Sequence, residues 1–114
     1  MIAKKKYFME CHLAGRKYYD ADEVWDKLTV GTSLKLIWDK DNKHDEDAVA
    51  VIYTDKDSKD DYHLGYIPSS DNSTIASFLQ MGWDDVFDCR ICKLDAKAYS
   101  ENQIHLKIRI NKKQ

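Results

Sequence analysis

The sequence is poor in the residues that mark flexible linkers, since one proline and four glycines occur among 114 residues. Unstructured linkers are usually rich in these residues, so we expect a single folded domain that spans residues 1–114. No apolar run approaches the roughly 18 residues that a membrane-spanning helix requires. The basic start Lys4–Lys6 is not followed by an apolar segment, as it would be in a secretory signal, and we expect a cytoplasmic protein without membrane contact.

Cysteine is also scarce, and its three positions are Cys11, Cys89 and Cys92. An odd number without a secretory signal argues against a disulfide framework and indicates small buried thiols. Cys89 and Cys92 form a CxxC, but they fall in a predicted strand, where residues three apart point to opposite faces. No second CxxC or histidine pair accompanies them, so we expect neither a zinc site nor redox chemistry.

The sequence has no glycine-rich phosphate loop and no GxSxG nucleophile motif, and its four histidines are scattered. The acidic run Asp39–Asp47 does not fit a calcium loop, because His44 stands at the sixth position and Ala50 at the twelfth. Catalysis requires a nucleophile or an acid–base set held in position, and none is visible. We therefore expect a protein that is not an enzyme and that needs no metal or cofactor.

Charge is unevenly distributed along the chain, although the net charge is only −2. Residues 1–19 sum to +4, residues 20–61 to −7 and residues 62–114 to +1. Non-specific binding along DNA needs a broad basic surface, which this pattern excludes. A local basic groove that holds a few nucleotides remains compatible with it.

Alternation of apolar and polar residues predicts about six strands, at 7–13, 33–38, 48–53, 62–67, 86–94 and 104–110. Two short helices are predicted at 22–28 and 72–81, the second ending at Gly82. No strand–helix–strand rhythm is present, so we expect a mainly β fold in which an antiparallel sheet curls into a small barrel. The predicted core contains Trp38, Val49, Val51, Ile67, Phe78, Leu79 and Leu106.

Two predicted loops have the composition of a site for single-stranded nucleic acid. Basic and aromatic residues stand side by side in Gly15–Tyr19, and polar residues crowd Asn42–Asp45 just before a strand. Lysine and arginine suit phosphates, and aromatic rings suit stacked bases. Aromatic residues beside lysine also occur on ordinary sheet surfaces, so composition alone leaves both interpretations open.

The order of these elements resembles the HIRAN family over about residues 8–110. The resemblance is carried by an N-x-x-D-x-x-A-V element at Asn42–Val49, followed by L-G-Y-I-P at Leu64–Pro68. Family members occur as single bacterial domains and as modules of helicase-like proteins that remodel stalled replication forks. The resemblance implies an OB-like barrel and capture of a single-stranded DNA end that carries a free 3′-hydroxyl.

The resemblance also implies roles for individual residues. Lys17 and Tyr18 stand where the family places a basic side chain and a stacking ring. Asp45 stands where a carboxylate accepts the hydrogen bond of the terminal hydroxyl, and Asn42 lies in the same loop. His44 takes the place of an aromatic ring that helps to sandwich the end base.

Tyr66 is expected to line the same groove, and Tyr99, in the last hairpin, is a further candidate ring. The chain departs from the family in having His44 where tyrosine is commoner, which reduces stacking, and Ser69 where a basic residue is common. Asn42 and Asp45 also have a structural interpretation, in which both cap the turn that leads into the next strand.

The leading hypothesis is therefore a monomeric DNA-binding module for single-stranded 3′ ends, acting in DNA repair or replication-fork processing alongside DNA-repair proteins. A second hypothesis is a protein-interaction adaptor that acts through the acidic segments Asp39–Asp47 and Asp55–Asp61. The third is a hydrolase in which Asp45 and neighbouring acids hold Mg²⁺.

Overall fold

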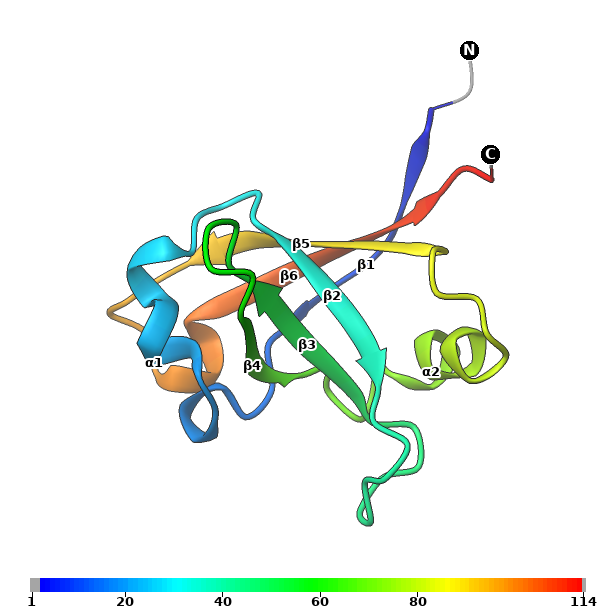
Figure 1. Ribbon diagram of the computed structural model, residues 1–114, viewed down its shortest axis with the longest axis horizontal. Coiled ribbons are helices and arrows are strands. Elements are labelled where there is room, and N and C mark those ends of the chain that lie inside the picture. Colours follow the sequence, from blue (N-terminus) through cyan, green and yellow to red (C-terminus); the bar gives the residue numbers. More distant parts are fainter. Residues whose placement is uncertain (1–2, 114) are drawn as a thin grey trace.

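The computed structural model describes residues 3–113 and contains one six-stranded sheet with two short α-helices (Figure 1). The strands are β1 (Lys5–His12), β2 (Ser33–Trp38), β3 (Val49–Thr54), β4 (Asp61–Tyr66), β5 (Phe87–Leu94) and β6 (Ile104–Asn111). The helices are α1 (Ala21–Val24) and α2 (Ser73–Gln80), with 3-10 turns η1 (Arg16–Tyr18), η2 (Trp25–Lys27) and η3 (Ser100–Asn102). No helix in the described part of the chain is long and apolar enough to cross a membrane.

All strand pairs are antiparallel, in the order β1-β6-β5-β2-β3-β4. The predictions of a mainly β fold, six strands and two short helices are therefore confirmed. The predicted closure into a barrel is not confirmed, because β1 and β4 form the two ends of the sheet. Within residues 3–113, a single isolated bridge, between Ala14 and Tyr66, joins the chain just beyond β1 to β4.

The sheet splays in its middle, between β2 and β5. β2 pairs with β5 at only two positions, Ser33 with Arg90 and Leu34 with Cys89. β2 then diverges from β5 and continues to pair with β3 through Trp38. In Figure 1, β2 and β3 cross the plane of β5 and β6 at a steep angle, and α2 lies beside the end of β2.

The core lies on the inner face of this bent sheet, and strand alternation explains its composition. In β6, Ile104, Leu106 and Ile108 are fully buried while the residues between them are not. Burial of each such aliphatic side chain contributes roughly 1.5–3 kcal/mol. Four of the predicted core residues are buried as expected: Val49, Val51, Ile67 and Leu106.

The predicted burial of Phe78 is wrong. The two residues of α2 that are fully buried are Ile75 and Ala76, and Phe78 lies outside that face with 40% of its surface exposed. It packs edge-on against Phe87, with ring centroids 5.5 Å apart. Trp38 and Leu79, also predicted in the core, are only half-buried. Both line the cavity where β2 diverges from β5.

Candidate nucleic-acid interface

Two backbone hydrogen bonds fasten the segment after β1 to the end of β4. Ala14 N donates to Tyr66 O over 2.8 Å, and Tyr66 N donates to Ala14 O over 2.9 Å. The approach is close, because a Cβ atom at Gly65 would lie 2.4 Å from the Ala14 carbonyl oxygen. A residue with a side chain would push the two segments apart. The glycine of the L-G-Y-I-P element therefore sets the position of the chain that leads into η1.

The turn into η1 begins at Gly15, whose φ of 71° lies in the left-handed region. Arg16 follows and is buried, with its Nη2 atom 2.8 Å from Asp22 Oδ1. Its guanidinium carbon lies 5.0 Å from the centroid of the Trp25 ring, a cation–π distance. Arg16 thus fastens η1 to the helix that follows, and the basic side chain that η1 presents to solvent is that of Lys17.

A hollow of about 380 Å³ lies between η1 and η3, lined by residues 15–18 and 99–101. We call it the aromatic hollow. Tyr18 and Tyr99 are 73% and 85% exposed, and Lys17 Nζ lies 5.0 Å from the centroid of the Tyr18 ring. The structure therefore brings together three of the predicted site residues, Lys17, Tyr18 and Tyr99, from distant parts of the sequence.

The acidic loop, residues 39–47, connects β2 to β3 and is organised by its own side chains. Asn42 Oδ1 accepts hydrogen bonds from His44 N at 2.9 Å and from Asp45 N at 3.0 Å. Asp45 Oδ1 accepts from Asp47 N, and Asp45 Oδ2 accepts from Nδ2 of the buried Asn72, each at 2.9 Å. The interpretation of Asn42 and Asp45 as turn-capping residues is thus confirmed.

The Asp45 carboxylate can accept more hydrogen bonds than the two that cap the turn. An ionised carboxylate has about four acceptor positions, and the two hydrogen bonds occupy two of them. The side chain is also only half-buried, so a ligand hydroxyl can reach it. His44, at the tip of the acidic loop, is exposed.

Tyr66 lies between the aromatic hollow and the acidic loop. Its hydroxyl donates to Asp39 Oδ2 over 2.7 Å, and Asn42 Nδ2 lies 3.4 Å from the same oxygen. Its ring packs at 5.5 Å from Tyr19 and 4.8 Å from His63, which themselves are 4.3 Å apart. Burial and the hydrogen bond to Asp39 raise the pKa of Tyr66 above its usual value, so its hydroxyl stays a donor.

Within residues 3–113, Tyr66 makes hydrogen bonds or ring contacts toward both sides, whereas no direct hydrogen bond joins Lys17, Tyr18 or Tyr99 to the acidic loop. The predicted site residues thus form two groups, one on each side of Tyr66.

Sequence reasoning missed His63, Tyr19 and Asp39 as members of this network. In a regular strand, residues three apart face opposite sides, so His63 and Tyr66 would not meet. β4 contains a β-bulge, in which Val51 pairs with Gly65 but the next residue, Ile52, pairs with His63. The available signal was Gly65 itself, because a glycine inside a strand often marks a bulge or a close approach of backbones.

The three cysteines are free thiols, and Cys11 and Cys89 are buried. Burial raises the pKa of Cys11 to about 12 and raises those of Cys89 and Cys92 above the usual thiol value. These groups are therefore neutral thiols near pH 7. Among residues 3–113, no group of three or more histidine, cysteine or acidic side chains is arranged to hold a metal ion.

Known proteins share the sequence pattern and the fold of this chain. The family model described as HIRAN domain matches residues 6–112, which agrees with the expected extent of about residues 8–110. A crystal structure of a protein from Lactobacillus plantarum, a target of the Northeast Structural Genomics Consortium, matches with a TM-score of 0.74. That match has 20% sequence identity and covers 95% of this chain and 97% of the other, so it establishes a common fold. No curated protein matches the chain.

Proposed function

This chain belongs to the HIRAN domain family, known as a nucleic-acid-binding module, and from that premise we propose that it binds the 3′ end of single-stranded DNA. One observation carries the proposal. The aromatic hollow presents exposed rings and a cation, and the acidic loop presents a carboxylate that can accept further hydrogen bonds. A single strand offers bases to the first and a terminal hydroxyl to the second.

In the aromatic hollow, Tyr18 and Tyr99 supply stacking surfaces for the last bases of the strand. Base–aromatic stacking is worth roughly 1–3 kcal/mol per base and depends little on sequence. Lys17 supplies a charge for a backbone phosphate. Its position 5.0 Å from the Tyr18 ring keeps the ammonium beside the stacked base. This side of the site therefore provides affinity.

In the acidic loop, Asp45 accepts a hydrogen bond from the terminal 3′-hydroxyl. A hydrogen bond to a charged group contributes roughly 1.5–3 kcal/mol. A 3′-phosphate removes the donor and places a second negative charge beside the carboxylate, so it is rejected. His44, at the tip of the same loop, stacks on the end base. This side of the site therefore provides discrimination between ends.

The same proposal assigns no catalysis to the domain, which acts as a binding module in DNA repair or at replication forks. The adaptor hypothesis is favoured less, because several carboxylates of the acidic segments are engaged within the chain. Asp55 is buried and forms an ion pair with Lys27. Asp39 and Asp45 are engaged by Tyr66 and Asn72.

A fluorescence-anisotropy titration tests the proposal with four oligonucleotides of one sequence. These are a single strand with a free 3′-hydroxyl, one with a 3′-phosphate, one with a 5′-phosphate and a free 3′-hydroxyl, and a blunt duplex. We expect the two free 3′ ends to bind about tenfold or more tightly than the 3′-phosphate. Equal affinity for all three single strands would refute end recognition, and absence of binding to any oligonucleotide would refute the DNA-binding role.

Incubation with ATP and with labelled DNA, each with and without Mg²⁺, tests the absence of catalysis. We expect no turnover. A turnover that disappears in Asp45→Asn would instead support the hydrolase hypothesis.

A further inference from the structure

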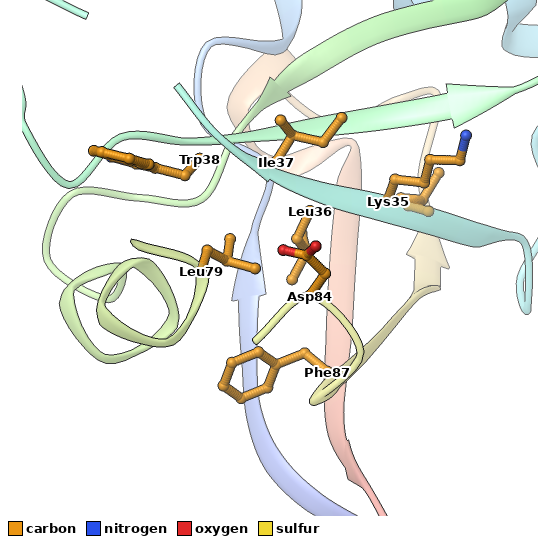
Figure 2. A pocket seen from close by; sticks show the side chains of 8 residues that line it. Lys35, Leu36, Ile37, Trp38, Leu79, Asp84 and Phe87 are labelled. Atoms are coloured by element: carbon orange, nitrogen blue, oxygen red, sulfur yellow. The ribbon is translucent and has the colours of Figure 1, made fainter. Parts of the chain in front are cut away.

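A second cavity lies along β2 where this strand has diverged from β5, and it is lined by none of the residues assigned to the proposed DNA site. It has a volume of about 530 Å³, and Figure 2 shows side chains from β2, α2 and the following loop converging on it. The residues used below are Leu36, Trp38, Leu79, Asp84 and Phe87. We call this cavity the β2 groove.

The backbone of β2 is unpaired along the β2 groove. Successive residues of a strand direct their N–H and C=O groups to opposite sides. Asp39 N donates to Ala48 O on the β3 side, so Leu36 and Trp38, an odd number of residues away, direct their groups to the other side. Pairing with β5 ends at Leu34, and within residues 3–113 no strand pairs with this edge beyond it. An open strand edge is a template for another extended chain.

Exposed apolar side chains occur on the elements that line the β2 groove and on the loop between α2 and β5. Met81 and Trp83 are 74% and 53% exposed, and both lie in the segment between α2 and β5 that carries Asp84. Phe78 and Ile37, also exposed, extend the apolar character onto α2 and β2. Large apolar side chains that gather on a surface mark interaction sites more often than chance.

Two charged side chains line the β2 groove, those of Asp84 and Lys35. Figure 2 shows the Asp84 carboxylate between Leu36 and Phe87, and within residues 3–113 this carboxylate forms no ion pair. At the other end of the cavity, Lys35 already has Asp61 at 4.0 Å. An occupant that completes the β2 groove therefore brings apolar side chains and one positive charge.

We propose that the β2 groove binds an extended segment of a partner protein, which adds as a strand to the open edge of β2. Its backbone pairs with the N–H and C=O groups of Leu36 and Trp38. The side chains on one face of the added strand, at alternate positions, enter the cavity, where apolar side chains pack on Leu79 and Phe87 and a lysine or arginine contacts Asp84. Strand addition of this kind takes affinity from main-chain hydrogen bonds and specificity from the pockets for alternate side chains.

Nucleic acid does not fit the same surface. A phosphate backbone cannot reproduce the alternating donors and acceptors of a strand, and Asp84 repels it. None of the residues assigned to the DNA site lines the β2 groove, and the two sites are connected through the hydrogen bond from Trp38 Nε1 to Glu46 O in the acidic loop.

The experiment uses the whole chain, labelled with ¹⁵N, and a short synthetic valine–lysine peptide, in which threonine alternates with valine, lysine and valine so that the lysine and the valines share one face. One control peptide carries glutamate in place of lysine. A second carries N-methyl groups on alternate amides, which removes backbone donors while keeping the side chains. The variants are Asp84→Lys and, as a matched charge change on an exposed residue elsewhere, Asp26→Lys.

We expect the valine–lysine peptide to shift the amide signals of Leu36 and Trp38 and to slow their hydrogen exchange about tenfold or more. N-methylation should abolish binding. Because an exposed ion pair contributes little, Asp84→Lys should weaken binding about twofold to fivefold and Asp26→Lys should not. The glutamate peptide should bind Asp84→Lys better than it binds the original chain.

Three results would overturn the proposal. The first is the absence of shifts at Leu36 and Trp38 up to millimolar peptide. The second is equal binding of the N-methylated peptide, which would show apolar association without strand pairing. The third is a dimer in sedimentation experiments whose formation protects these two amides, which would make a second copy of the chain the occupant. None of these results bears on the titration with DNA ends.

Discussion

The aromatic hollow and the acidic loop are built in opposite ways. The side chains of Tyr18 and Tyr99 are largely exposed and, within residues 3–113, donate and accept no side-chain hydrogen bonds. In the acidic loop, Asn42 and Asp45 are each engaged by two backbone or side-chain donors. Tyr18 and Tyr99 therefore contribute little to the stability of the fold, whereas Asn42 and Asp45 maintain the shape of the acidic loop.

This difference separates what substitutions should do on the two sides. Replacement of an exposed ring removes a binding surface and leaves the folded chain as stable as before. Replacement of a capping side chain leaves backbone N–H groups without partners and lowers the free energy of unfolding. Stability and binding, measured together, therefore report which side of the site a substitution affects.

The largest effect is expected where the two sides are joined, at Gly65. Gly65→Ala places a Cβ atom against the Ala14 carbonyl and should lower the free energy of unfolding by about 3 kcal/mol in urea denaturation. It should also weaken DNA binding, because η1 moves away from Tyr66. Gly31→Ala is the control, since Gly31 also has a positive φ but nothing within 4 Å of an added Cβ. Gly31→Ala should lower the free energy of unfolding by only about 1 kcal/mol. If both substitutions lower the free energy of unfolding equally, the close approach of Gly65 to Ala14 does not hold the two sides of the site together.

The next effect concerns affinity without stability. Tyr18→Ala should weaken binding of a single strand by roughly 1–3 kcal/mol, whatever its 3′ end, and change the free energy of unfolding by less than about 0.5 kcal/mol. Anisotropy and urea denaturation measure the two quantities. Tyr7→Ala, which removes an exposed ring on β1, should leave binding unchanged. A similar loss of affinity in both variants would mean that stacking is not localised in the aromatic hollow.

The converse effect is expected at Asn42. Asn42→Ala removes the acceptor for His44 N and Asp45 N and should lower the free energy of unfolding by about 1 kcal/mol. Lys43→Ala, an exposed neighbour in the same loop, should lie within about 0.5 kcal/mol of the original chain. If thermal or urea denaturation does not separate these two variants, the acidic loop is not maintained by Asn42.

The smallest effect is electrostatic. Lys17→Ala should reduce the slope of log affinity against log salt concentration by about 0.7, the contribution of one phosphate contact on a single strand. Its stability should not change. Lys56→Ala, an exposed lysine in the turn after β3, should leave the slope unaltered. An unaltered slope in both variants would remove Lys17 from the phosphate contact.

Much of this architecture could be predicted, because alternation along a strand depends on local sequence. The strand predicted at 104–110, observed as Ile104–Asn111, and the buried pair Val49 and Val51 followed directly from it. The barrel could not be judged in the same way. Its closure depends on pairing between the edge strands β1 and β4, which are distant in sequence, and local alternation carries no information about that pairing.

The site was predictable in its parts and not in its arrangement. The resemblance supplied Lys17, Tyr18 and Tyr99, and the structure adds that they share one hollow. The contact of His63 with Tyr66 depends on a bulge, which adds one residue and reverses the face on which a side chain lies. Such a reversal is invisible to a pattern that assumes regular alternation.

The most direct test of the division between affinity and discrimination compares Asp45→Ala with Asn72→Ala. Both variants break the hydrogen bond from Asn72 Nδ2 to Asp45 Oδ2, but only the first removes the carboxylate. The quantity is the ratio of the dissociation constants for the 3′-phosphate and the free 3′-hydroxyl strands. We predict that this ratio falls close to one in Asp45→Ala and stays about tenfold or more in Asn72→Ala. A ratio that persists in Asp45→Ala, or that collapses equally in both variants, would contradict the assignment of end recognition to the Asp45 carboxylate.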